Sequence, residues 1–76
     1  MEELLKILEQ MHPEVDFETE EHLIDGMILD SFDIVQLISE IHEEFDVTID
    51  AKYILPENFN SAKALYALIE QIEEED

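Results

Sequence analysis

The sequence predicts an all-α fold, a small bundle of three main helices plus one short helix. Apolar residues repeat at helical spacing from Leu4 to Met11, from Ile34 to Phe45 and from Ala62 to Ile72. The alternating segment from Val47 to Ile49 has no second strand to pair with, which excludes a sheet. Leu, Ile, Val and Phe make up 26 of the 76 residues, about a third, which is enough for a folded chain despite its high charge. We expect one domain over residues 1–76.

The first helix is expected to end at Met11. Leu4, Leu8 and Met11 fall at i, i+4 and i+7 and would form its apolar stripe. Pro13 pushes His12 out of the α region, so the helix cannot continue through this pair.

The segment from Pro13 to Leu29 shows no clean period, although it holds several apolar residues. A stretch of this length without structure is unusual in a small domain, and Thr19 is a candidate cap for a short helical turn within it. Asp25 and Gly26 signal a further turn. We interpret the segment as an ordered, packed loop.

The clearest helix start in the chain lies at Ser31. Asp30 can cap this helix, and Asp33 stands three residues later in a capping-box position. Leu29 and Ile34 occupy the two positions of a hydrophobic staple. The inward positions of this helix follow at helical spacing: Ile34, Ile38, Ile41 and Phe45.

The C-terminal part should be an extended link followed by two helices. Asp50 is a candidate cap for a short helix that reaches Leu55 and is stopped by Pro56. Asn60 or Ser61 would cap the last helix, with inward positions Ala62, Leu65, Leu68, Ile69 and Ile72. The acidic end, Glu73 to Asp76, opposes the helix dipole and is expected to fray.

Charge determines which partners the chain can have. It carries 22 acidic residues against 3 basic ones, a formal net charge of -19, so its partners should be basic proteins. Nucleic acid binding is excluded, because affinity for phosphates comes from lysine and arginine. The N-terminus lacks the basic region of a signal peptide, the longest apolar run (Ala64 to Ile69) is too short for a membrane span, and cysteine is absent. We therefore expect a cytoplasmic protein.

No residue pattern indicates an enzyme. The chain has one glycine, so it lacks a glycine-rich phosphate loop, and it has no cysteine nucleophile. His12, His22 and His42 show no zinc-binding spacing, and we assign no metal site, although His42 and Asp46 stand at i and i+4. A domain this small is also a poor host for a catalytic cleft. We expect no catalytic residues.

Ser31 has two interpretations on its position alone. It is the first residue of the expected helix and follows a long packed loop. It could simply belong to the helix cap. It could also be a covalent attachment point, because a phosphodiester there would lie at the positive end of the helix beside free backbone N–H groups. Spacing alone does not decide between them.

The segment Leu29-Asp30-Ser31-Phe32 resembles the Leu-Asp-Ser-Leu attachment motif of the acyl carrier protein family, and the resemblance in length, acidity and helix order spans essentially the whole chain. It implies that Ser31 receives phosphopantetheine from coenzyme A, with Asp30 and Phe32 beside it in the cofactor-binding motif. The thiol of the arm would carry an acyl or aminoacyl thioester between enzymes. The chain would be a non-catalytic carrier.

The helix after Ser31 resembles the recognition helix of this family. The resemblance implies that it meets a phosphopantetheinyl transferase, an adenylating or acyl-loading enzyme and a downstream transferase, each with a basic docking surface. We expect the carrier to act as a monomer. The partner-binding residues implied are Asp33, Val35, Gln36, Glu40, Glu43 and Glu44.

Three departures from the family pattern bear on the cargo. Phe32 replaces the usual leucine, and Gln36 stands where fatty acid carriers often have glutamate. Gly26 lies farther from Ser31 than the family's glycine, so Met27 stands near the place where backbone freedom is expected. With the segment 56–60, the chain looks closest to stand-alone D-alanyl carriers, and we expect a small polar cargo because bulky residues fill the core.

Two alternatives stay open at this point. One is a fatty acid or polyketide carrier, since the small residues Ala62, Ala64 and Ala67 could leave a hollow beside the last helix. The other belongs to a different class, an acidic interaction protein without covalent modification, in which Ser31 only helps to cap a helix. Its charge alone would fit that role.

Overall fold

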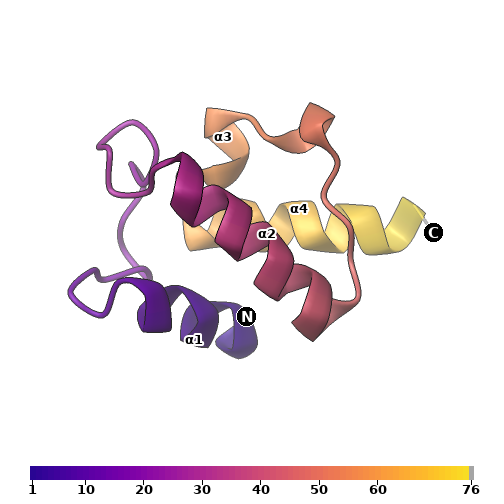
Figure 1. Ribbon diagram of the computed structural model, residues 1–76, viewed down its shortest axis with the longest axis horizontal. Helices are drawn as coiled ribbons and strands as arrows, with labels where there is room; N and C mark the ends of the chain where they lie inside the picture. Colours follow the sequence, from indigo (N-terminus) through magenta and orange to yellow (C-terminus); the bar gives the residue numbers. More distant parts are fainter. Residues whose placement is uncertain (76) are drawn as a thin grey trace.

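The computed structural model describes residues 1–75 and has the predicted all-α architecture. The long helices are α1 (Glu2–Met11), α2 (Ser31–Phe45) and α4 (Ala62–Glu75), and the short elements are a 3₁₀ turn, η1 (Ala51–Tyr53), and α3 (Pro56–Phe59). No strand occurs among these residues. In Figure 1, α2 crosses in front of α4, with α1 and α3 on opposite sides of the crossing. Helix α1 packs against α2 and α4, and α3 packs against α4.

The core is wholly apolar. Within the described residues no polar or charged side chain is buried, and no buried side-chain nitrogen or oxygen lacks a hydrogen-bond partner. The acidic side chains of residues 1–75 therefore keep contact with water, as their desolvation cost requires. The side chains that are at most 1% exposed come from every part of the fold: Leu4, Leu8, Leu23, Leu37, Ile41, Phe59, Ala62, Leu65 and Ile69.

The link after α2 adds to this core without forming a sheet. Asp46 ends α2 in the left-handed region, with φ 56°, and its N–H donates to the His42 carbonyl. Val47 and Ile49 are then buried, whereas Thr48 between them is exposed. The extended link predicted from the alternation is confirmed.

The short helix was predicted on the wrong side of Pro56. The predicted helix through Leu55 is only the turn η1, and Leu55 itself is extended. Pro56 is instead the first residue of α3, because its ring fixes φ at a helical value and its missing N–H is one that a first turn leaves unpaired in any case. Helix α3 buries Phe59 in the core.

Helix α4 is capped by Ser61 and is ordered to its end. The Ala64 N–H donates to Ser61 Oγ at 3.0 Å, so Ser61, not Asn60, is the cap. The predicted fraying is wrong for Glu73 to Glu75, which are helical. The Tyr53 hydroxyl donates to Glu75 Oε1 at 2.8 Å and ties η1 to the end of α4. Asp76, also part of that prediction, lies outside the described residues.

The loop between α1 and α2 is ordered by turns, as predicted, but Thr19 does not cap a helix. Asp16 organises the turn there: its side chain accepts the Glu18 N–H and its carbonyl accepts the Thr19 N–H. An aspartate whose side chain accepts a backbone N–H two residues later forms such a turn by itself. This loop ends in a second turn, over residues 23–28, that leads directly into α2.

The second turn has the hydrogen bonds of a Schellman motif. The Ile28 N–H donates to the Leu23 carbonyl and the Met27 N–H donates to the Ile24 carbonyl, both at 3.0 Å. Met27 holds the left-handed position of the motif, with φ 60°, which confirms that backbone freedom is needed at this residue. Gly26 precedes it and serves another purpose, because a Cβ there would lie 2.6 Å from the His22 carbonyl oxygen.

Asn60 holds this turn against the rest of the fold. Its Oδ1 accepts the N–H groups of Ile24 and Asp25 at 2.9 and 3.0 Å, and its Nδ2 donates to Asp25 Oδ2 at 3.1 Å. Its carbonyl accepts the Leu23 N–H at 2.9 Å. One residue between α3 and α4 thus satisfies three backbone N–H groups of the loop that precedes Ser31.

We predict that Asn60→Ala destabilises the domain by about 1–2 kcal/mol, because two backbone N–H groups lose their acceptor while the backbone contact to Leu23 remains. Urea unfolding measures the loss, and amide exchange should quicken first at Ile24 and Asp25. Ser61→Ala is the matched control, since it removes one cap bond of α4. Unchanged exchange at Ile24 in Asn60→Ala would contradict this account of the loop.

Candidate functional site

Ser31 is the first residue of α2 and is exposed. The predicted capping box is present: the Asp33 N–H donates to Asp30 Oδ1 at 2.9 Å, and the Asp30 N–H donates to Asp33 Oδ2 at 3.3 Å. Because these two aspartates make the capping bonds, the Ser31 hydroxyl has no part in the cap. It stands in water at the end of a helix whose first turn is fixed.

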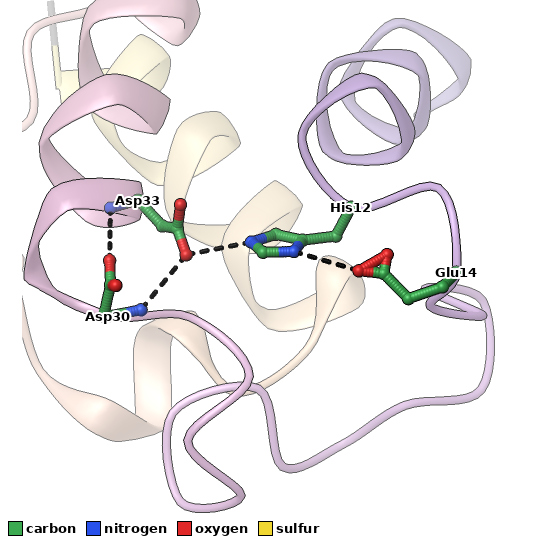
Figure 2. Close-up of polar contacts among 4 residues, drawn as sticks. All are labelled: His12, Glu14, Asp30 and Asp33. Carbon is green, nitrogen blue, oxygen red and sulfur yellow. Dashed lines mark hydrogen bonds and ion pairs between the residues drawn. The ribbon is translucent and has the colours of Figure 1, made fainter.

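The histidine that follows α1, His12, completes this arrangement. His12 Nε2 lies 2.9 Å from Asp33 Oδ2, and His12 Nδ1 lies 3.3 Å from Glu14 Oε1. Figure 2 shows the ring between these two carboxylates, with Asp33 also reaching Asp30. The His12 backbone N–H in turn caps α1 by donating to the Leu8 carbonyl. One residue therefore joins the end of α1 to the start of α2.

The contact shifts the pKa of both partners. The hydrogen bond to Asp33 raises the pKa of His12 above its ordinary value of 6.5, although partial burial opposes the change. Partial burial would raise the pKa of Asp33, but the hydrogen bonds from His12 and from the Asp30 backbone outweigh it, and the pKa falls below the ordinary value of 3.8. Both shifts favour the charged pair.

An apolar surface surrounds Ser31. Met27 is 88% exposed, Phe32 85% and Val35 68%, and Ile54 and Leu55 are also exposed. An open groove of about 550 Å³ runs beside Ser31, with Met27, Val35 and Ile54 among its walls. A smaller recess of about 140 Å³ continues it between α2 and α3, lined by Ile24, Ile34, Ile54, Leu55, Pro56 and Phe59. Large apolar side chains exposed together in this way are typical of a contact surface.

The acidic residues of α2 fall into two groups. Glu40, Glu43 and Glu44 line a groove between α1 and α2 that also holds Lys6. Asp33 is separate from these glutamates. Its side chain is only 22% exposed and contacts His12. Gln36 is exposed near Val35. The structure thus gathers Phe32, Val35 and Gln36 near Ser31 and the three glutamates farther along α2, and the roles of all these residues remain predictions.

Histidine and carboxylate side chains do not gather into a metal cluster anywhere in residues 1–75. His42 lies 3.3 Å from the Thr48 hydroxyl and so contacts the link after α2. His12 is engaged by carboxylates in a structural contact.

The description of the family model that matches residues 1–69 is phosphopantetheine attachment site. The chain belongs to this family. Its members carry a covalent phosphopantetheine group and meet a phosphopantetheinyl transferase and further partner enzymes. No curated protein matches the chain. None of the helices described between residues 1 and 75 has the length and hydrophobicity that crossing a membrane requires.

The residues at the start of α2 fit this prosthetic group. An exposed serine hydroxyl can take a phosphodiester without any rearrangement of the core. The backbone N–H groups of the first helical turn have no acceptors within the helix, so they and the helix dipole favour a phosphate there. His12 contacts Asp33, the carboxylate two residues after Ser31, and would offset its charge when protonated.

The sequence patterns did not reveal two residues that support the site. The sequence did not assign His12 or Asn60 a role at the site, yet His12 contacts Asp33 in the first turn of α2 and Asn60 holds the turn that precedes Ser31. His12 is 21 residues from Asp33, and Asn60 is 36 from Ile24. Local signals such as helix caps and apolar periodicity do not report contacts between residues so far apart in the sequence. The one available signal was that a histidine and a carboxylate on different helices can form an ion pair.

We predict that His12 stabilises the domain in a pH-dependent way. Because its pKa is raised on folding, its contribution is complete below pH 6.5 and is lost as the pH rises through the folded-state pKa. Because the pKa of Asp33 is lowered, the contribution of that carboxylate is present above pH 3.8 and is lost as the pH falls through its folded-state value. The pair should therefore stabilise most between these two values.

The measurement compares urea unfolding of the wild type and His12→Gln at about pH 5.5 and about pH 8.5. The wild type should be more stable by about 0.5–1 kcal/mol at the lower pH and by less at the higher one. His22→Gln is the control, because His22 is mostly exposed and approaches Glu20 only to 3.8 Å. A stability difference for His12→Gln that stays constant with pH would refute the ion pair.

Proposed function

We propose that this chain is a carrier protein whose phosphopantetheine arm is attached to Ser31. The observation that supports this is the exposed Ser31 hydroxyl at the capped start of α2, in a chain of the phosphopantetheine attachment family. Transfer from coenzyme A forms a phosphodiester at Ser31 Oγ, the hydroxyl loses its proton, and the nucleotide part of coenzyme A leaves. The thiol of the bound arm then supplies thioester chemistry.

In this proposal the chain itself is not catalytic. Asp30 and Asp33 hold the first turn of α2, so Ser31 is presented in a fixed position. Phe32, Val35 and Gln36 offer a docking surface beside the arm, and Glu40, Glu43 and Glu44 attract enzymes with basic surfaces. We propose that residues 1–76 act as one monomeric carrier domain in the cytoplasm, with a transferase, a loading enzyme and a downstream acceptor enzyme as partners.

We further propose a small polar cargo, with D-alanyl as the best candidate. The recess between α2 and α3 has about 140 Å³, close to the roughly 150 Å³ cavity that holds one benzene molecule. Phe59 and Ile41 already fill the centre of the bundle. The wider groove beside Ser31 is open to water, so a long chain lying there would bury only part of its surface. A charged aminoacyl group gains no free energy from burial, so it can stay in solvent.

Incubation with coenzyme A and a permissive phosphopantetheinyl transferase should add one phosphopantetheine per chain, measured as intact mass. Ser31→Ala should remain helical by circular dichroism and accept none, because it lacks the nucleophile. Ser39→Ala is the matched control from the same helix and should be modified like the wild type. Modification of Ser31→Ala would place the site elsewhere, and an unmodified wild type would favour an acidic interaction protein.

The cargo is tested by melting temperature. D-alanyl, butyryl and octanoyl forms of the carrier are compared with the form that bears the free thiol. We expect the D-alanyl form and the free-thiol form to have the same melting temperature. The octanoyl form should melt only slightly higher than the butyryl form, because the recess is small. A rise that continues to octanoyl, at roughly 0.8 kcal/mol for each added methylene, would favour a fatty acid or polyketide carrier.

A further inference from the structure

Met27 holds a backbone conformation that its side chain disfavours. It has φ 60° in the left-handed position of the turn over residues 23–28, where glycine is usual. Aspartate tolerates this region better than most residues, which accounts for Asp46, the other residue with positive φ among those described. A methionine has no such local compensation, since its side chain cannot hydrogen-bond to its own backbone.

The two hydrogen bonds of the turn hold the Met27 backbone in this conformation, but contacts of its side chain within the fold do not offset the strain. The Met27 side chain is 88% exposed, so it contributes almost nothing to the core. It stands on the wall of the open groove that also includes Ser31, Val35 and Ile54. A strained residue whose side chain protrudes beside a reacting hydroxyl indicates a contact made outside the chain.

We propose that Met27 is a specificity-determining contact for the phosphopantetheinyl transferase, and this inference rests on the proposed function of Ser31. The Met27 side chain enters an apolar socket of that enzyme, next to the basic residues that meet Asp25 and Asp30. The transferase is the one partner whose reaction takes place at Ser31 Oγ itself, so it must cover the surface around this atom. Enzymes that act on the cargo react at the far end of the arm.

The chemistry of the surface matches this occupant. The apolar side chains of Met27, Phe32 and Val35 protrude around Ser31, while exposed carboxylates of Asp25 and Asp30 flank them. An apolar centre with an acidic rim is complementary to an apolar socket with a basic rim. The unbranched, flexible thioether of methionine adapts readily to such a socket.

The experiment measures kcat and KM for modification of the full-length carrier by a permissive transferase with coenzyme A. Met27→Gly and Met27→Asn should both raise the melting temperature, because each residue accepts the left-handed region, and both should lower kcat/KM about tenfold, mainly through KM. Met27→Leu keeps an apolar side chain and should stay within about twofold of the wild type. The asparagine variant excludes an effect of glycine flexibility.

Asp46→Gly is the matched control. It changes the other residue with positive φ, at the opposite end of α2, about 22 Å from Ser31 along a helix of 15 residues. At that distance its charge is screened at physiological ionic strength. Its kcat/KM should equal that of the wild type.

Equal kcat/KM for the wild type, Met27→Gly and Met27→Asn, with one phosphopantetheine on Ser31 in each, would overturn the role of Met27 and leave the proposed function intact. Variants that are modified at the wild-type rate but melt differently only after modification would also overturn it, because Met27 would then contact the arm of its own chain. A wild type that stays unmodified by an active transferase would overturn both.

Discussion

The contact between His12 and Asp33 is the interaction on which the position of Ser31 depends. Asp33 Oδ2 accepts from the Asp30 backbone and lies 2.9 Å from His12 Nε2, so one carboxylate belongs both to the cap of α2 and to the junction with α1. Asn60 holds the preceding turn, over residues 23–28, through Ile24 and Asp25. Both the first turn of α2 and the turn before it are therefore held in place, although the Ser31 side chain itself is exposed.

The large negative charge explains why such contacts matter in this fold. With a net charge of -19 the folded chain repels itself, and the apolar core and the few polar contacts between elements must together oppose that repulsion. No charged side chain is buried among the described residues, so none pays the full cost of desolvation. Two carboxylates that reach other elements are hydrogen-bonded there: Asp33 to His12, and Glu75 to Tyr53. In the proposed function the remaining acidic side chains at the surface would attract basic partners.

Local sequence patterns predicted the long helices because each must bury one face, and periodicity records that face directly. Only the resemblance to the family, through the spacing of Gly26 from Ser31, placed the need for backbone freedom near Met27; the local patterns did not. They erred at Pro56, where proline can equally end one helix or begin the next, and at Thr19, where the nearby Asp16 forms the turn instead. The supports of the site, His12 and Asn60, come from contacts between distant segments, and no local pattern encodes these.

In the proposed function, the surface around Ser31 would recognise partner enzymes in two ways, through long-range charge attraction and through short-range apolar contact. The carboxylates act over a distance of several ångströms and would bring basic enzymes to α2 whatever the detailed shape of those enzymes. The exposed apolar side chains would act only in direct contact, so they could make the carrier bind one basic enzyme more tightly than another. These side chains are Met27, Phe32 and Val35. A small carrier that serves several enzymes needs both, because charge alone would admit every basic protein. If Met27 makes the contact proposed for it, the strain in its backbone is stability that the fold gives up to hold an apolar side chain beside the Ser31 hydroxyl.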